Sequence, residues 1–156
     1  MNELIGKVEQ WAIDRNLHTA SPRGQTLKVI EEFTETLMAH DDNDTDGVID
    51  GIGDTYVTLI ILCKQLGIKF SIPMVNMYFW DDEQEIQPAE VLNWLVSGVA
   101  KKDNKSTRLG VTGLLVALNE LMETYELTPK QCLSAAYNEI KDRKGKMIDG
   151  VFCERV

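Results

Sequence analysis

Three observations predict an all-α fold for this chain. Apolar residues recur at the 3.6-residue spacing of amphipathic helices over residues 2–15 and 22–40. Residues 48–66 are apolar nearly all round beyond Asp54, which is typical of a helix buried among others. The sequence offers no strand-length segment with alternating apolar and polar residues. We therefore expect one domain, residues 1–156, built as a helical bundle.

Local signals divide the chain into expected helices over residues 2–15, 22–40, 48–66, 90–99, 110–125 and 129–143. Two of these helices follow a capping residue and a proline in the first turn, at Ser21–Pro22 and Thr128–Pro129. Gly67 is placed to end the third helix. The remaining segments are polar or irregular, and the tail is expected to be partly extended: residues 41–47, 69–88, 101–107 and 144–156.

Composition limits the kinds of binding partner that we expect for this chain and the cellular compartment in which we expect it. The net charge of −9 repels a phosphate backbone, so we expect no nucleic-acid polymer as partner, whereas a small phosphorylated ligand needs only a local basic patch or a cation. The longest apolar run is too short to span a membrane, and the N-terminus lacks a secretory pattern. Three widely spaced cysteines, odd in number, indicate reduced thiols in the cytoplasm.

An acidic stripe marks the second expected helix. On a helical wheel Lys28, Glu31, Glu32 and Glu35 fall at about 0°, 300°, 40° and 340°, so they share one face. The apolar residues of this helix are expected on another face, where Leu27, Ile30, Leu37 and Met38 lie together with Thr34. Taken alone, such a stripe is more often a solvated helix surface than a site.

A second acidic pair changes that interpretation. Asp50 and Asp54 share a face of the third helix that continues into Val57 and Ile61, so they point toward a partly buried region. Buried carboxylates repel one another unless a cation binds between them, and Mg²⁺ or Mn²⁺ prefers carboxylate oxygen. We therefore predict a divalent-metal site at which acids of the two helices meet. Gly51 and Gly53 lie between the two aspartates, and their lack of a side chain would let another group come close to this part of the helix.

A calcium-binding loop is the competing hypothesis, from a different class of protein. Asp42, Asp44, Asp46 and Gly47 match the first, third, fifth and sixth positions of an EF-hand loop over residues 42–53. The twelfth position is Gly53, where a bidentate Glu should stand. An ordinary polar turn explains the same residues. As a function, this alternative would be a calcium-binding helical module without catalytic activity.

Basic residues gather near the C-terminus, within the motif Asn138-Glu-Ile-Lys-Asp-Arg-Lys-Gly-Lys-Met147. In so acidic a chain, two explanations fit equally well. The cations could stabilise a helix C-terminus through its dipole, or they could hold phosphates, with Arg143 binding two oxygens at once. His18 and His40 are isolated, which argues against a zinc site.

Three ordered motifs resemble the MazG-like branch of the all-alpha NTP pyrophosphatase superfamily, with phage-encoded members most similar. They are Gln25-Thr-Leu-Lys-Val-Ile-Glu-Glu-Phe-Thr-Glu35, Asp50-Gly-Ile-Gly-Asp54 and the basic motif at residues 138–147. The opening Trp11-Ala-Ile-Asp-Arg15 is also similar. The likeness spans residues 8–152 and is loose between residues 69 and 128. It implies a four-helix core with additional helices, and a homodimer or homotetramer.

The resemblance implies a nucleoside triphosphate diphosphatase, which hydrolyses an NTP or dNTP to the monophosphate and pyrophosphate with Mg²⁺ or Mn²⁺. It would serve nucleotide-pool control in the cytoplasm, the host cytoplasm if phage-encoded. The family's Glu-x-x-Glu lands on Glu32 and Glu35, and the Asp of its Glu-x-x-Asp lands on Asp54. The Glu of that second motif falls on Gly51, so Asp50 is expected to substitute.

The expected residue roles follow from that match. The catalytic residues are Glu31, Glu32, Glu35 and Asp54; the metal ligands are these four with Asp50. Glu31 or a metal-held hydroxide activates a water that attacks the alpha phosphorus. The expected substrate-binding residues are Gln25, Lys28, Asn138, Lys141, Arg143, Lys144 and Lys146. The sequence leaves the base preference open; residues 69–88, with Trp80, are the candidate segment for it.

Overall fold

The computed structural model describes residues 1–72, 87–148 and 151–154, without the side chains of residues 146, 147 and 151–154. Helices dominate this part of the chain, and none of its helices is long and apolar enough to cross a membrane. The elements are α1 (Asn2–Asp14), the 3₁₀ turn η1 (Leu17–Thr19), α2 (Pro22–Asp41), α3 (Thr45–Leu66), α4 (Pro88–Lys101), α5 (Asn104–Thr124), α6 (Pro129–Ile140), β1 (Gly145–Ile148) and β2 (Val151–Glu154).

The expected helical architecture is confirmed, with one addition at the C-terminus. The partly extended tail is an antiparallel hairpin in which Gly145 of β1 pairs with Glu154 of β2. The expectation of a partly extended tail is therefore confirmed, and the hairpin is a small addition to a helical fold. Four-residue strands are too short to leave a clear alternating pattern in the sequence.

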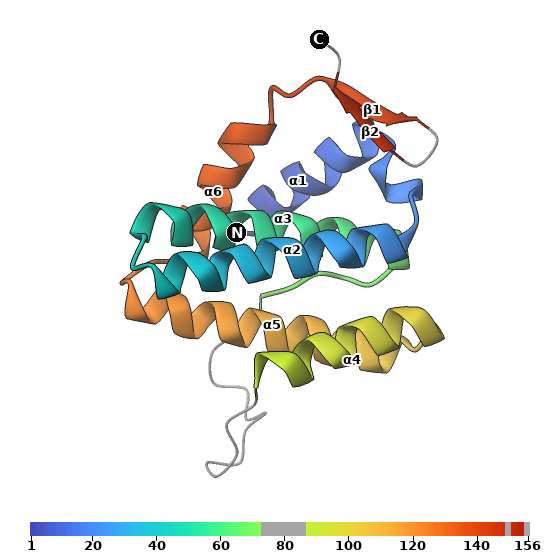
Figure 1. The fold of residues 1–156 in the computed structure, drawn as a ribbon. Helices are drawn as coiled ribbons and strands as arrows, with labels where there is room; N and C mark the ends of the chain where they lie inside the picture. Colours follow the sequence, from blue (N-terminus) through green and yellow to red (C-terminus); the bar gives the residue numbers. More distant parts are fainter. Residues whose placement is uncertain (73–86, 149–150, 155–156) are drawn as a thin grey trace.

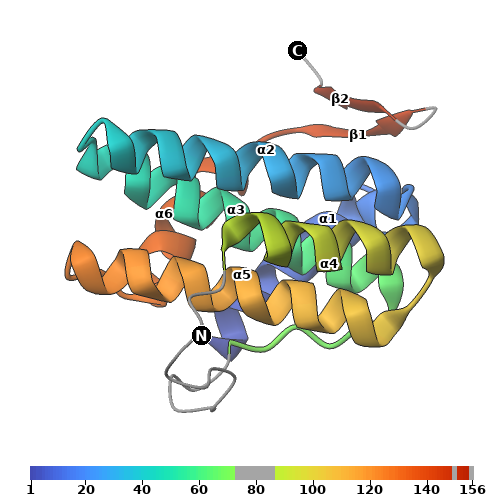
Figure 2. The same ribbon diagram turned by 60° about the horizontal axis from the view of Figure 1, so that its bottom comes forward.

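Helix α3 is the centre of the molecule. Figures 1 and 2 show α2 and α3 side by side, with the α4–α5 pair on one side and α1 and α6 on the other. Almost every α3 residue from Gly51 to Cys63 is buried, Asp54 being the exception. The pattern of an all-round apolar helix is thus explained, because α3 contacts α1, α2 and α6 along its length.

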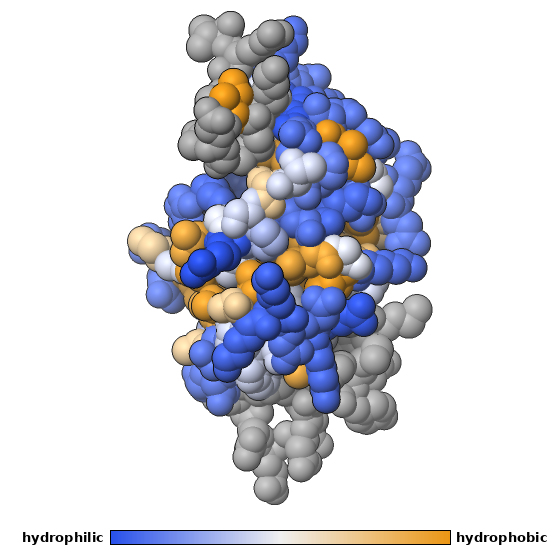
Figure 3. All heavy atoms as spheres, turned by 90° about the vertical axis from the view of Figure 1, so that its right-hand side faces the viewer, coloured by the Kyte–Doolittle hydropathy of each residue, from blue (hydrophilic) through white to orange (hydrophobic). Residues whose placement is uncertain are grey.

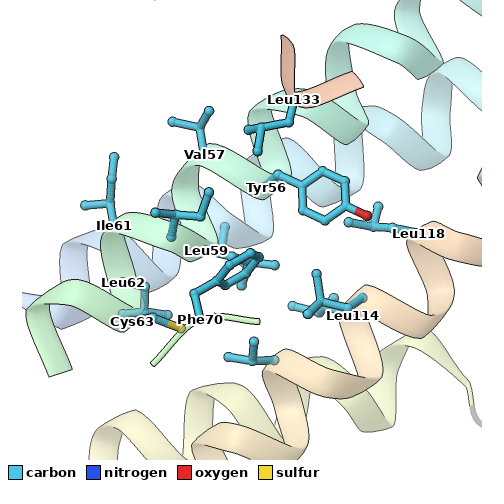
Figure 4. Close-up of a cluster of buried hydrophobic side chains, with 14 of the residues drawn as sticks. Tyr56, Val57, Leu59, Ile61, Leu62, Cys63, Phe70, Leu114, Leu118 and Leu133 are labelled. Carbon is cyan, nitrogen blue, oxygen red and sulfur yellow. The ribbon is translucent and has the colours of Figure 1, made fainter. Parts of the chain in front are cut away.

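Two faces of α3 serve different purposes. Figure 4 shows Tyr56 and Leu59 directed toward Leu114 and Leu118 of α5, with Phe70 between them. The Tyr56 and Phe70 rings meet edge to face, 6.4 Å between centroids. Val57 and Ile61 point away from α5 in the same view. The first face builds the core, and the second is free to line a cavity.

Capping residues set two helix starts that differ from our expectation. Helix α3 begins at Thr45 instead of Val48, because the Asp44 side chain accepts a hydrogen bond from the Gly47 amide. Helix α5 begins at Asn104 instead of Gly110, because Asp103 caps the amides of Lys105 and Ser106. The linker expected at residues 101–107 is therefore mostly helical.

The end of α6 also differs from the expected Arg143. The helix stops at Ile140, whose carbonyl accepts hydrogen bonds from the Trp11 indole of α1 and from the Arg143 amide. Those two donors bend the chain into a turn where the helical pattern alone would continue. The start signals at Ser21 and Thr128 and the left-handed end at Gly67 (φ 67°) are confirmed.

The buried face of α2 is not the one we expected. Val29 and Phe33 are buried together with Thr26 and Thr36, whereas Leu27 is 67% and Met38 is 60% exposed. Both threonines donate to backbone carbonyls of their own helix, so burial leaves no hydroxyl without a partner. Figure 3 shows apolar surface enclosed by hydrophilic side chains on the face at the right of Figure 1.

Two glycines of α3 let neighbouring helices approach its backbone. A Cβ on Gly51 would stand 2.4 Å from the Thr36 hydroxyl of α2, and one on Gly53 would stand 2.4 Å from the Cys132 carbonyl of α6. The close approach that we expected at these glycines is made by α2 and α6. No side chain larger than hydrogen fits at either position without a shift of backbone.

We expect Gly53→Ala to destabilise the fold by about 1–3 kcal/mol, since the added methyl group overpacks the α3–α6 contact. Urea unfolding followed by circular dichroism measures this change. Gly6→Ala on α1 is the control, because a Cβ there meets nothing within 4 Å. The control should be neutral or slightly stabilising. Equal stability of the two variants would contradict this packing.

Candidate functional site

The acidic stripe of α2 lies along the edge of its buried face. Lys28 donates to Glu31 at 2.7 Å and lies 3.7 Å from Glu32. Glu31 and Glu35 are exposed, whereas the Glu32 side chain is only 17% exposed. Burial raises the pKa of Glu32 above its usual value, and the charge of Lys28 opposes that rise. The expected single face is thus confirmed, with Glu32 as its most buried acid.

Asp54 is the most perturbed carboxyl group of this region. Desolvation raises its pKa to about 7, and the negative charges of Asp50, Glu32 and Glu139 add to the rise. These neighbours come from α3, from the preceding helix α2 and from α6, which is distant in sequence. Acids of α2 therefore lie close enough to raise the pKa of acids on α3.

Glu139 of α6 is the acid that sequence reasoning missed. Burial raises the pKa of Asp50, and the negative charge of Glu139 adds to this rise. Glu139 in turn forms an ion pair with Arg143, one helical turn further on. Glu139 could have been recognised because it lies within the basic motif at residues 138–147, four residues before Arg143.

A cavity of about 480 Å³ opens beside these acids. Helix α3 contributes the face that carries Asp54, Val57 and Ile61, the side directed away from α5 (Figure 4). Walls come from α1, η1, α2 and the end of α6. Five of the predicted site residues line it: Gln25, Lys28, Glu32, Asp54 and Arg143.

Helix α1 fixes the end of α6 where it borders the cavity. The Trp11 indole donates to the Ile140 carbonyl at 2.9 Å. Arg15 donates from two nitrogens to the Arg143 carbonyl and stacks over Trp11, 4.5 Å from the ring centroid. The Trp11–Arg15 motif is therefore a positioning device for Arg143, a role that its sequence alone did not reveal.

Several predicted residues lie outside the cavity lining. Asn138 and Lys141 are exposed and bond to each other at 3.2 Å, and Lys144 is exposed. Lys146 belongs to β1, but its side chain lies outside the described residues, as does Trp80. Glu31, Glu35 and Asp50 are not part of the lining either; they border it through Lys28, Glu32 and Asp54.

Among the described residues, no group of three or more His, Cys, Asp or Glu side chains stands in an arrangement that could hold a metal ion. Each wall of the site instead pairs an acid with a cation, Glu31 with Lys28 on α2 and Glu139 with Arg143 on α6. Gly51, the position at which the resemblance described above implies a glutamate, is buried against Thr36. Asp50 is the nearest carboxylate in sequence to that position.

The loop required by the calcium hypothesis is not formed. Residues 45–53 belong to α3, and Asp44 uses its side chain to cap that helix. An EF-hand needs its twelve residues to wrap around the ion between two helices. The segment over residues 42–53 is therefore a short turn followed by helix, which agrees with the ordinary-turn interpretation.

Comparison with known proteins gives one relationship to report. The chain is 42% identical over 66 residues to an uncharacterized 18.2 kDa protein in the rep-hol intergenic region of Haemophilus phage HP1. The match covers 42% of this chain and 40% of that protein, so less than half of each is compared. No known protein family and no solved structure matches the chain.

The raised pKa of Asp54 predicts how stability depends on pH. The folded chain keeps this proton up to pH about 7, whereas an unfolded aspartate loses it near pH 4. The protonated Asp54 carboxyl therefore contributes fully to the free energy of unfolding below about pH 4, and this contribution is lost as the pH rises through 7. We expect Asp54→Asn to unfold at higher urea than the native chain at pH 8, in EDTA, and this difference to vanish near pH 4.

Glu120→Gln, which neutralises an exposed carboxylate of α5, is the control for this titration. It should change the urea midpoint little at any pH, because an exposed charge gains little from its surroundings. If the urea midpoints of Asp54→Asn and the native chain were equal at every pH from 4 to 8, the raised pKa of Asp54 would be contradicted.

Proposed function

We propose that this protein hydrolyses a nucleoside triphosphate to the monophosphate and pyrophosphate, as a MazG-like enzyme that uses Mg²⁺ or Mn²⁺. One observation carries the proposal: acids of α2, α3 and α6 gather around the half-buried Asp54 at a cavity that also holds Lys28 and Arg143. Carboxylates crowded in this way favour a bound cation, and cations on the wall favour phosphate.

By ligand chemistry the candidate residues suit a hard divalent cation, because every one of them is a carboxylate. Glu32 and Asp54 would hold the ion, with Glu31, Glu35 and Asp50 as further ligands. Such an ion stabilises negative charge on the phosphates. Gly51 leaves room for α2 to come close, and in this proposal Asp50 would take the place of the glutamate that MazG-like enzymes carry.

The cations of the cavity wall bind the phosphates in this proposal. Lys28 and Arg143 exchange their present partners, Glu31 and Glu139, for phosphate oxygens. Release from Lys28 leaves Glu31 free to accept a proton from the attacking water. The water oxygen forms a bond to the alpha phosphorus, the bond from that phosphorus to the bridging oxygen breaks, and pyrophosphate leaves.

We expect Asp54→Asn and Glu35→Gln each to lower turnover by at least ~10²-fold, as when ligands of a catalytic metal are lost. A pyrophosphate-release assay over all common NTPs and dNTPs, with Mg²⁺ and with Mn²⁺, measures this. Glu120→Gln serves as the matched control, since Glu120 lies on α5 outside the cavity. Near-native turnover in both site variants, or nucleotide binding without pyrophosphate release in the native chain, would refute the proposal.

The proposed enzyme is a homodimer or homotetramer. Leu27 and Met38 support this, because they are largely exposed apolar side chains on the helix that carries the acidic stripe. We expect Leu27→Lys to weaken assembly, since association would bury an unpaired charge. Sedimentation velocity of the native chain and the variant gives the mass. A monomeric native chain would contradict the proposed oligomeric state. The activity would still be tested separately, by the hydrolysis assay.

A further inference from the structure

Positive charge is concentrated at one end of this acidic protein. Residues 55–72 and 91–119 together hold 6 of the 16 lysines and arginines but only 1 of the 25 acidic residues. The two segments meet in space, because α3 ends on the side of the molecule where α4 turns into α5, at the right of Figure 1. All six cations are exposed: Lys64, Lys69, Lys101, Lys102, Lys105 and Arg108.

Two hollows in this surface share Arg108 and Thr112 as lining residues. Their volumes are about 390 Å³ and about 260 Å³. Among the described residues, no acid lines either hollow, and neither shares a lining residue with the acidic cavity. Their other polar lining residues are Asn104 and Lys105 in the larger hollow and Lys69 and Ser71 in the smaller one.

The polar side chains of the hollows have no partners within the described part of the chain. None of the six forms a side-chain hydrogen bond or an ion pair there. Lys28 and Arg143 of the acidic cavity differ in this respect, because each is paired with a glutamate. Lysine, arginine, hydroxyl and amide groups can all donate hydrogen bonds, so the group that suits these hollows is an anion with several acceptor oxygens.

Asp103, the single acid of residues 91–119, does not occupy these donors. Its carboxylate accepts hydrogen bonds from the amides of Lys105 and Ser106 and from the Ser106 hydroxyl. Its charge offsets part of that of Lys105, but it lines neither hollow. Because Asp103 caps the start of α5, the side chains of the hollows, not the helix N-terminus, would hold an anion.

We propose that the two hollows form a second ligand site, separate from the acidic cavity, for a small molecule with two linked phosphate groups. Arg108 borders both hollows, and its planar guanidinium can donate to oxygens of two phosphates at once. Lys105 adds a cation to one hollow and Lys69 to the other. A small ligand fits better than a long nucleic acid, because the rest of the chain is acidic and repels a phosphate backbone.

The test titrates the full chain with inorganic pyrophosphate, in EDTA and at constant ionic strength, and follows ¹⁵N NMR resonances. We expect the Arg108 side-chain Nε–H and the Thr112 amide to shift and to reach saturation. Orthophosphate should bind at least about tenfold more weakly, because it reaches one hollow at a time. Resonances of the acidic cavity report separately on any pyrophosphate bound by Lys28 and Arg143, so the two sites are distinguished.

Lys105→Gln and Lys130→Gln form a matched pair. Each removes one positive charge from an exposed second residue of a helix, α5 or α6, but Lys130 lines neither hollow. Arg108→Gln should weaken pyrophosphate binding at least about tenfold and Lys105→Gln about threefold or more, because charge-assisted hydrogen bonds are lost. Lys130→Gln should bind as the native chain does. Circular dichroism checks that each variant is folded.

Three results would overturn this site. The first is the absence of saturating shifts at Arg108 and Thr112. The second is an equal loss of affinity in Lys105→Gln and Lys130→Gln, which would mean that net charge alone attracts the anion. The third is an oligonucleotide that shifts these resonances while pyrophosphate does not, which would assign the surface to nucleic acid. None of these measurements involves turnover, so each result is independent of the proposed hydrolysis.

Discussion

The close approach of α2 and α6 to the backbone of α3 is the constraint on which the site depends. At Gly51 and Gly53 a side chain of any size would meet Thr36 or the Cys132 carbonyl. These contacts lie on either side of Ile52 and within one turn of Asp50 and Asp54. Helices packed so tightly carry their own acids, Glu32 and Glu139, into the surroundings of Asp54.

Burial and the crowding of negative charge make ionisation of the acids in this region less favourable. Burial raises the pKa of Glu32, Asp50 and Asp54, and the charges of Glu32 and Asp50 add to the rise at Asp54. On the opposite face of α3, Tyr56 is fully buried against Leu114 and Leu118 of α5 (Figure 4). A fold that holds acids together at such a cost is typical of a functional site.

The cavity extends from this group of acids along α3 to a part of the molecule that is lined by apolar and amide side chains. Its apolar floor and the Gln65 amide belong to the same helix as Asp54, so α3 fixes the distance between the two ends. Trp11 and Arg15 of α1 hold the turn that carries Arg143. These hydrogen bonds to main-chain carbonyls hold the wall of the cavity that α6 provides.

The sequence by itself determined the helices, the caps at Ser21 and Thr128, the end at Gly67, and the acid-bearing faces of α2 and α3, because these follow from local periodicity and capping. Only the tertiary structure decided the rest. The buried face of α2 uses Thr26 and Thr36, whose hydroxyls are satisfied within the helix, instead of Leu27 and Met38. Glu139 belongs to the site only because α6 packs against α3, which is far away in sequence, and periodicity along one segment does not record what packs against it.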